Sequence, residues 1–392
     1  MSAPPRVPLS GLVIQGKVPI VPSPAELVWN LNLDQIEANT GRVLAKEMVA
    51  PGELGPSTYF FEHGTLLYSK LRPYLNKVVV ADAPGYATTE LVPLRCNAEA
   101  VCAHYLAHFL RSPEFLQFAN TVVAGAKMPR MVMSEFWRYE IPLPPLPEQR
   151  RIAAILDQAD ALRAKRREAL AQLDRLTQAI FVEMFGDPVT NPKKWPASMQ
   201  LGEVADIVSG VTKGRNLEGK ATRVLPYLAV ANVQDKALNL LNVKEIEATD
   251  TEIQRYKLQR NDLLLTEGGD PDKLGRGTLW NNELPECIHQ NHVFRVRVTH
   301  NAVTPCFLNW LIGSERGKKY FLRSAKQTTG IASINMTQLR GFPLLVPPLG
   351  LQQEFEKRVD AVRQLTKRAE ESAKQVDALF TSLQHRAFRG EL

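Results

Sequence analysis

The chain has 392 residues, which is too many for one ordinary hydrophobic core and fits two domains with accessory helices. Hydrophobic residues make up 44% and charged residues 23%, as in globular proteins, and no apolar run approaches the roughly 20 residues of a membrane span. These values argue against a membrane protein. The formal charge of +7 favours an acidic partner, because Lys and Arg side chains neutralise phosphates.

Several features predict a cytoplasmic protein without disulfides. Three prolines interrupt the first eight residues, where a secretory signal peptide needs an apolar run. The four cysteines are Cys96, Cys102, Cys287 and Cys306. They form no C-x-x-C pair, and a chain of this size needs no disulfide, so we interpret them as free buried thiols.

The first 141 residues or so predict a mixed α/β unit. Runs of β-branched and apolar residues indicate strands at 65–68, 78–80 and 91–94, and helices are expected at 100–110 and 113–120. A proline-rich segment follows this unit. Because proline fixes φ and keeps the preceding residue out of the α region, this segment should be extended and stiff.

A long helix is predicted from Pro147 to Phe185, and Gly186-Asp187-Pro188 ends it. A second mixed unit should then cover about 197–346. Its elements are expected as strands at 203–208, 263–266 and 292–298 and a helix near 305–312. Another proline pair precedes a final long helix, predicted from Leu351 to Phe388.

The second half of the chain repeats the first at a shift of 203 residues. Met133-Ser134-Glu135-Phe136 aligns with Met336-Thr337-Gln338-Leu339. The apolar heptad positions of the two long helices align at the same shift, and we expect them to pack the helices together. They are Ile152, Ala159, Leu162, Leu173, Leu176 and Ile180, and Phe355, Val362, Leu365, Val376, Leu379 and Leu383. A repeat this long indicates a duplicated module rather than a solenoid.

A helix of about 40 residues is near 60 Å long and would expose an apolar seam if it were alone. We therefore expect the two helices to pair antiparallel. The predicted fold is α+β: two similar mixed α/β domains separated by two long antiparallel coiled-coil helices, as a pseudo-twofold dumbbell. The expected boundaries are 1–145 and 187–349 for the domains and 146–186 and 350–392 for the helices. Two similar domains at a fixed spacing suit duplex DNA with two half-sites.

The segments that enter the helices carry a resemblance to a known family. Ile141-Pro142-Leu143-Pro144-Pro145-Leu146-Pro147-Glu148-Gln149-Arg150, running into a heptad helix, resembles the conserved-region boundary of specificity subunits from type I restriction-modification systems. Residues 343–354 are similar, with Leu351 in place of Glu148, and residues 387–392 resemble the usual end of such subunits. The pattern covers nearly the whole chain.

This resemblance implies a non-catalytic subunit of a DNA methylation and phage-defence system. Its two target-recognition domains would each read half of a bipartite DNA sequence, and the paired helices would set the unspecified spacer. It implies three kinds of partner: double-stranded DNA, modification subunits that carry S-adenosylmethionine, expected as a pair, and restriction subunits that use ATP and Mg. No cofactor is expected on this chain.

Candidate DNA contacts are basic, aromatic and amide side chains, because Lys and Arg bind phosphates or guanine edges and Asn pairs with adenine. In the first domain they are Lys70, Arg72, Tyr74, Asn76, Lys77, Lys127 and Arg130. In the second domain they are Lys213, Arg215, Lys273, Arg276, His289, Gln290, Asn291, Lys326 and Gln327. The alternative for each tract is an ordinary solvated surface that supports the fold.

No catalytic or metal site is predicted. Residues 214–221 nearly match a phosphate-binding loop, but Ala221 stands where Ser or Thr should hold magnesium, and no helix is expected to follow. His104 and His108 lack the spacing partners of a zinc site. Two other classes stay open: a self-sufficient DNA-modifying enzyme and a structural coiled-coil adaptor without a DNA role.

Overall fold

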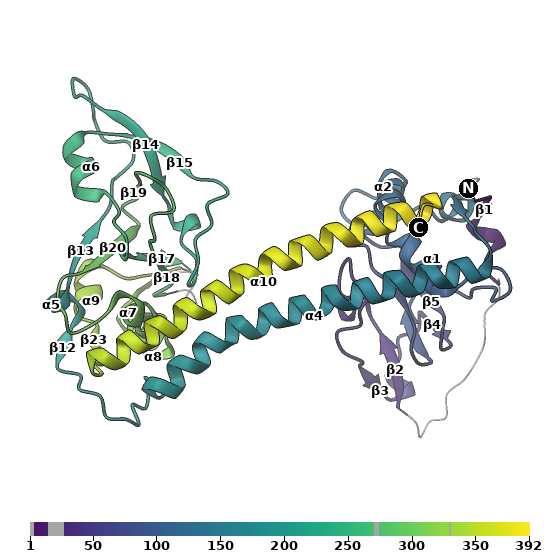
Figure 1. Cartoon of the computed structure of the whole chain (residues 1–392), viewed down its shortest axis with the longest axis horizontal. Helices are drawn as coiled ribbons and strands as arrows, with labels where there is room; N and C mark the ends of the chain where they lie inside the picture. Colours follow the sequence, from purple (N-terminus) through teal and green to yellow (C-terminus); the bar gives the residue numbers. More distant parts are fainter. Residues whose placement is uncertain (1–3, 15–26, 270–273, 329–330) are drawn as a thin grey trace. The chain divides into compact units, whose positions relative to one another are not determined.

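The computed structural model describes residues 4–14, 27–269, 274–328 and 331–392. The chain divides into two compact units: unit 1 comprises Met1–Leu170 and Ala369–Leu392, and unit 2 comprises Ala171–Arg368. There are two long helices, α4 (Leu146–Phe185) and α10 (Leu349–Arg389), and each has one part in unit 1 and the other part in unit 2 (Figure 1). The predicted domain boundaries, which treat each helix as a separate segment, stay a prediction.

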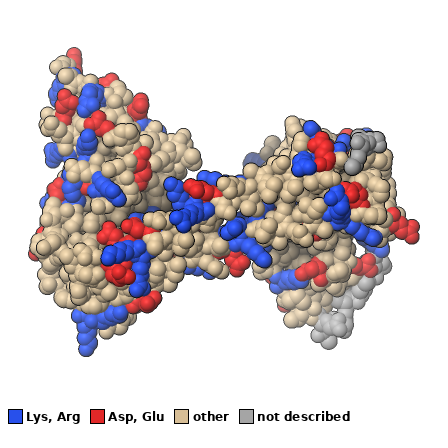
Figure 2. Space-filling view, viewed as in Figure 1, with Lys and Arg blue, Asp and Glu red and all other residues tan. Residues whose placement is uncertain are grey.

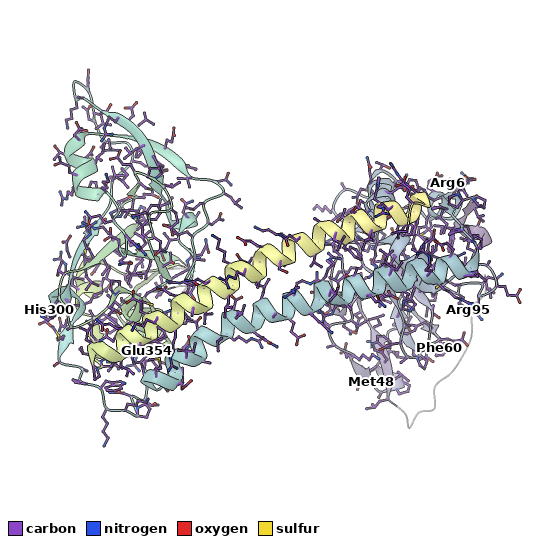
Figure 3. The ribbon with its side chains drawn as sticks, viewed as in Figure 1. Arg6, Met48, Phe60, Arg95, His300 and Glu354 are labelled. Carbon is purple, nitrogen blue, oxygen red and sulfur yellow. The ribbon has the colours of Figure 1, made fainter. Side chains whose placement is uncertain are left out.

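Two small sheets form the globular part of unit 1. The first has the order β3-β2-β7-β4, with β3 (Met48–Val49), β2 (Val28–Leu31), β7 (Gly85–Thr88) and β4 (Thr58–Phe61). The second has the order β6-β5-β8, with β6 (Val78–Val80), β5 (Leu66–Ser69) and β8 (Leu91–Leu94). Figure 3 labels Met48 and Phe60 on the first sheet. All four residues of β5 are buried, so this strand is the centre of the second sheet.

Three helices pack against the second sheet of unit 1: α1 (Ala103–Leu110), α2 (Pro113–Thr121) and α3 (Met133–Arg138). The Ser112 hydroxyl accepts a hydrogen bond from the Phe115 backbone N–H and caps α2. Phe115 packs edge-on against Tyr68 of β5 and Phe136 of α3. Two short pairs complete the unit: β1 (Arg6–Pro8) with β11 (Glu140–Pro142), and β9 (Val123–Ala124) with β10 (Arg130–Met131).

Unit 2 contains three sheets and a short strand pair. The largest sheet has the order β13-β20-β16-β18, with β13 (Ala205–Ser209), β20 (Val293–Val298), β16 (Leu263–Thr266) and β18 (Gly277–Leu279). The second comprises β15 (Lys244–Ala248), β14 (Arg223–Leu228) and β19 (Ile288–His289). The third comprises β17 (Gly268–Gly269), β22 (Ile331–Ser333) and β21 (Lys326–Thr328), and β12 (Met199–Gln200) pairs with β23 (Pro343–Leu344).

The shorter helices of unit 2 are α5 (Leu201–Val204), α6 (Asp250–Tyr256), α7 (Pro305–Ile312), α8 (Glu315–Ser324) and α9 (Met336–Arg340). Short 3-10 turns occur at Leu9–Gly11, Leu33–Gln35, Pro51–Glu53, Pro73–Leu75 and Val230–Asn232. One predicted strand, 203–208, is wrong at its start, where α5 precedes β13. The Glu203 carboxylate accepts from the Gln200 backbone N–H, and this cap favours a helical turn at that point.

The long helices run antiparallel in each unit (Figure 1), and in unit 1 two contacts establish their direction. In unit 1, Arg163 of α4 donates to Asp377 of α10 at 2.6 Å, and Arg151, twelve residues earlier in α4, donates to the Leu392 carbonyl. In unit 2, the Phe355 ring of α10 lies 5.5 Å from Phe181 and 5.3 Å from Phe185 of α4. The apolar seam predicted from the heptads is therefore shared with the core of each unit.

One row of the predicted heptad packing is wrong. Four of the leucines are exposed rather than packed: Leu162 (57%), Leu176 (41%), Leu365 (50%) and Leu379 (57%). The buried row of α4 instead includes Leu156, four residues after Ile152, together with Arg163 and Thr177 at heptad intervals. This inner row includes polar residues, so a prediction from apolar heptad positions alone placed the exposed leucines on the packed face of the helix. The remaining predicted residues, in the row of Ile152 on α4 and of Phe355 on α10, are buried or half-buried.

A buried glutamine fixes the start of each long helix in the same way. The Gln149 amide donates to the carbonyls of Ala100 at 3.0 Å and Pro144 at 2.8 Å, and its oxygen accepts from the Cys102 N–H. The Gln352 amide, 203 residues later, makes the equivalent three bonds, to Ala302, Pro347 and Thr304. Both side chains are at most 1% exposed. We call each set a glutamine clamp; it ties a long helix to the globular part of its unit.

Candidate nucleic-acid interface

In unit 1 the end of β5 meets the β9–β10 hairpin. Leu71 pairs with Arg130 in an isolated antiparallel bridge. The Arg72 N–H donates to the Pro129 carbonyl at 2.7 Å, and the Met131 N–H donates to the Lys70 carbonyl at 2.8 Å. The two basic tracts that the sequence marked separately, near residue 70 and near residue 130, therefore form one surface. We call it the unit 1 platform.

The candidate side chains on this platform differ in exposure. Arg72, Tyr74 and Lys127 are exposed, and Lys70 is half-buried. Asn76 is only 7% exposed and donates to the Arg111 carbonyl, and the Lys77 ammonium donates to the Leu33 carbonyl. Asn76 and Lys77 are committed to contacts within unit 1, so the structure does not support the DNA contacts that the sequence predicted for them.

Arg130 and Glu90 form a bidentate ion pair on the platform. Arg130 donates to the Glu90 carboxylate from Nε at 3.1 Å and from Nη2 at 2.9 Å. The side chains are 45% and 22% exposed. The Glu90 backbone carbonyl also accepts from the Lys70 N–H, so the carboxylate is held at a fixed place beside β5.

Unit 2 builds the corresponding platform from β17, β22 and β21. Gly268, just beyond the end of β16, pairs with Ser333, which corresponds to Arg130 at the shift of 203 residues. The Ile334 N–H donates to the Glu267 carbonyl, and the Glu267 N–H donates to the His292 carbonyl. Among the predicted contacts, Lys326 and Gln327 lie in β21, and Lys273 lies outside the described residues. In both units a hairpin packs against the end of the central strand.

Two further tracts of unit 2 meet beside this platform. Val211 forms a parallel bridge with Gln290, and the Asn291 N–H donates to the Val211 carbonyl at 3.0 Å. Lys213 is exposed, and Gln290 and Asn291 are partly exposed. Gly210 permits the approach, because a Cβ at this position would lie 1.9 Å from the His289 carbonyl oxygen.

His289 is part of the core of unit 2. Its side chain is 0% exposed, and its Nδ1 lies 2.7 Å from the Val293 carbonyl oxygen. Burial lowers the pKa of His289 to about 4, which keeps the ring neutral. The structure therefore gives this side chain a packing role in place of the predicted DNA contact.

Arg215 and Arg276 hold loops of unit 2 together. Arg215 donates through Nε and Nη2 to the Glu252 carboxylate and also to the carbonyls of Thr212 and Glu247. The hydrogen bond from Arg215 lowers the pKa of Glu252 to about 2. Arg276 Nη1 donates to the Gln234 side chain at 3.2 Å. Most donors of Arg215 are thus engaged within the unit, and Lys213 is the freer cation of its tract.

The histidines that the sequence analysis weighed as zinc ligands make ordinary side-chain contacts. His104 and His108 both contact the Asp157 carboxylate, at 3.0 and 2.7 Å, and so are partners of an acid. Within the described ranges, no group of three His, Cys, Asp or Glu residues could hold a metal ion, and all four cysteines are free. No helix of the described residues combines the length and apolar character that crossing a membrane requires.

The charge pattern by itself does not outline the platforms. On the face shown in Figure 2, the Lys and Arg side chains of each unit are interspersed with Asp and Glu. Glu90 and the glutamine clamps were missed from the sequence. The clamps had a signal, because Gln149 and Gln352 coincide at the repeat shift, whereas Glu90 had none, since its partner lies 40 residues away.

Two α/β units with matching hairpin platforms, each clamped to the start of a long helix, form a duplicated module. A protein-family model, described as "Type I restriction modification DNA specificity domain", matches residues 57–173 and 192–376. The match covers more than half of the chain and occurs once in each half. The chain belongs to this family of DNA specificity domains.

Individual relatives agree with this assignment. The StySPI type I restriction enzyme specificity subunit of Salmonella potsdam is 25% identical over 334 residues, which cover 79% of this chain and 72% of that protein. The EcoKI specificity subunit of Escherichia coli K12 is 25% identical over 335 residues, with the same coverage.

Two solved structures share the fold. One, from work on complex assembly and conformational transition of a type I R-M system, covers 100% of both chains at 18% identity and a TM-score of 0.60. The other, the type I restriction-modification S subunit of M. genitalium, covers 98% of this chain and 96% of that chain, at 15% identity and a TM-score of 0.55.

Proposed function

We propose that this chain is the sequence-specific DNA-binding subunit of a type I restriction-modification complex and reads a bipartite target, one half with each unit. The observation that carries this function is the family match in both halves of the chain. The matching hairpin platforms support it, because in each unit a hairpin with basic residues in its sequence pairs beside the end of a central strand. In this function the chain supplies recognition, and its partners supply the chemistry.

The partners follow from the family. We propose that modification subunits, which bind S-adenosylmethionine, and restriction subunits, which use ATP and Mg, assemble on this chain. The glutamine clamp occurs once in each unit with the same three hydrogen bonds, so the helix entrance that a partner would meet is duplicated. This duplication supports two modification subunits per chain. The self-sufficient enzyme and the structural adaptor remain as outcomes of the tests below.

The exposed candidates on the platforms are the proposed contacts. In unit 1 they are Arg72, Tyr74, Lys127 and Arg130, together with the half-buried Lys70. In unit 2 Lys213, Gln290 and Asn291 have exposed or partly exposed side chains, and Lys326 and Gln327 are proposed from their backbone position in β21. Lys and Arg here would bind phosphates or base edges, and the amides would read bases. The helices α4 and α10 would set the length of the unread spacer.

The test is a footprint of the chain in complex with its modification subunit on a target found by mapping methylated bases. Two protected segments separated by a gap are expected. One continuous footprint, or binding that does not depend on sequence, would contradict the proposal and favour the adaptor. Methylation or cleavage by the chain alone, with the cofactors present, would favour the self-sufficient enzyme.

Substitution of a platform lysine sharpens this test. Replacing Lys70 or Lys127 with Ala should weaken binding, and a lost phosphate contact should lower the slope of log affinity against log salt by about 1. Replacing Lys77 with Ala is the matched control, because its ammonium is engaged by the Leu33 carbonyl inside unit 1. If all three variants change the salt slope equally, the platform is not the contact surface.

A further inference from the structure

The ion pair on the unit 1 platform has the geometry of a supported base-reading arginine. Arg130 is fixed by its backbone pairing with Leu71, and Glu90 is fixed by its backbone bond to Lys70. Both anchor points lie at the end of the buried strand β5. The two side chains are therefore held in register by the backbone of one rigid element and its neighbours.

The carboxylate occupies only one edge of the guanidinium. Glu90 accepts from Nε and from Nη2 of Arg130, and no described residue accepts from Nη1. A guanidinium has five N–H groups, so both hydrogens of Nη1 and the second hydrogen of Nη2 stay available, and one hydrogen from each nitrogen lies along the outer edge. That edge is a planar pair of donors, and the Arg130 side chain is 45% exposed.

Stability alone gives little reason for this pair. An ion pair between exposed side chains contributes little to folding, because water and salt screen it and two long side chains lose freedom. What a bidentate carboxylate does supply is orientation: it fixes the plane of the guanidinium and the direction in which the outer edge points.

In DNA an arginine can bind a phosphate or a guanine edge, and the Glu90 carboxylate affects these two kinds of binding differently. A phosphate is attracted by net positive charge, and a carboxylate about 3 Å away opposes that attraction. A guanine edge instead requires two aligned N–H donors for its O6 and N7 atoms, and a fixed guanidinium plane favours it. The geometry of the Arg130–Glu90 pair thus fits a guanine better than a phosphate.

We propose that Arg130 reads one guanine in the major groove of the half-site bound by unit 1, and that Glu90 is the positioning residue that orients it. This inference rests on the proposed function and deepens it. Arg130 donates two hydrogen bonds to one base, and Glu90 touches only Arg130. The remaining basic side chains of the platform, Lys70, Arg72 and Lys127, bind the surrounding phosphates.

The test uses the full chain with its modification subunit and a panel of targets in which each base pair of the unit 1 half-site is changed in turn. Arg130→Lys keeps the charge and removes the planar pair of donors. We expect it to lose discrimination at a single G·C pair by roughly 5- to 150-fold, with the other positions and the salt slope unchanged. Glu90→Gln should reduce discrimination at that same position by a smaller factor.

The controls separate reading from folding. Arg138→Lys and Glu135→Gln make the same two substitutions at an exposed ion pair on α3 of the same unit and should leave every position unchanged. Thermal denaturation should give the same midpoint for all four variants. If Arg130→Lys leaves discrimination intact, or if Arg130→Ala weakens all sequences equally and lowers the salt slope, Arg130 does not read a guanine. Wild-type complex without any sequence preference would instead contradict the proposed function itself.

Discussion

The two units join the same long helices with different chemistry. In unit 1 the contact between α1 and the helices adds a polar cluster to an aromatic contact. The Phe388 ring of α10 lies 5.0 Å from the Phe109 ring of α1. Beside it the buried His108 binds Asp157 of α4, and Arg163 of α4 bridges Asp160 and Asp377. In unit 2 the equivalent contact is aromatic, with Phe181 and Phe185 of α4 against Phe307 of α7 and Phe355 of α10.

The glutamine clamp is the same in both units. The side-chain contact of α1 in unit 1, or of α7 in unit 2, with the long helices differs, and we call this contact the seam of each unit. The clamp bonds only backbone groups, so its geometry depends on the path of the chain and survives changes in the surrounding side chains. The seam is made of side chains and can change its chemistry as long as volume and polarity stay matched. The duplication therefore preserves the entry of the helix and leaves the packing beside it free to diverge.

The largest expected effect comes from breaking the aromatic seam. Phe355→Ala removes a ring that is 0% exposed and should destabilise unit 2 by about 3–5 kcal/mol, because a buried aromatic side chain loses its transfer energy and leaves a cavity. Phe380→Ala is the matched change in unit 1. Phe380 is 7% exposed and packs under the Arg163 guanidinium at 4.3 Å, so a smaller loss is expected.

Hydrogen exchange measured by mass spectrometry assigns each loss to a unit, because peptides from a destabilised unit exchange faster. Faster exchange confined to unit 2 in Phe355→Ala is the expected result. Equal losses from Phe355→Ala and Phe380→Ala would mean that the two seams do not differ in the way their residues indicate.

The next effect concerns the feature that the units share. Gln149→Ala and Gln352→Ala each remove three buried hydrogen bonds and should cost about 1–3 kcal/mol, because backbone groups are left without partners. Equal costs are expected in the two units, read as shifts in urea denaturation midpoint. Gln353→Ala is the control: this side chain lies one residue beyond the clamp and is exposed, so its loss should change stability little.

Much of the fold was predictable from local signals, and the seam was not. The predicted starts and ends of the long helices agree with α4 and α10 within two residues, since proline and glycine mark them. The face of each helix was predicted only in part, because Arg163 and Thr177 occupy the inner row and the exposed Leu162 and Leu176 mimic it.

The platforms were predictable as tracts and not as side-chain roles. Basic and amide residues near β5 and β16 carried a compositional signal. Whether a side chain turns inward depends on partners distant in sequence, such as the Arg111 carbonyl for Asn76 or the Val293 carbonyl beside His289. The pairing of Arg130 with Glu90 likewise depends on the turn between β7 and β8, which no periodicity describes.

A smaller effect is expected from the polar seam of unit 1. Asp157 accepts from His104 and His108, and although burial opposes its ionisation, these hydrogen bonds hold its pKa well below the ordinary range. Asp157→Asn should destabilise unit 1 by about 1 kcal/mol, a value reduced for the partial exposure of the carboxylate. Asp360→Asn, at the corresponding position of unit 2, is the control, because Asp360 pairs with the exposed Arg363 rather than with a buried histidine. Equal effects of the two variants on the denaturation midpoint would contradict the difference between the seams.

The smallest effect is a difference in pH dependence between two histidines that share one carboxylate. Burial lowers the pKa of His108, although Asp157 and Asp160 oppose the shift and Arg111 adds to it. The hydrogen bond to Asp157 raises the pKa of the half-exposed His104. A histidine with a lowered pKa binds its proton more readily in the unfolded chain, so His108 should cost stability as the pH falls below about 6.5. His104 acts in the opposite direction: its stabilisation is present at low pH and is lost as the pH rises through its raised pKa.

Single substitutions separate the two contributions in unit 1. His108→Gln should make unit 1 less sensitive to acid, and His104→Asn should make it more sensitive, both read as the denaturation midpoint between pH 7.5 and pH 5. The substitution His63→Gln, at an exposed histidine of the same unit, controls for the loss of a histidine in general. Because the two rings contact the two oxygens of one carboxylate, opposite slopes require that burial outweighs the shared acid at His108. If both histidines instead stabilise unit 1 as the pH falls, the Asp157 carboxylate outweighs burial at His108 as well as at His104.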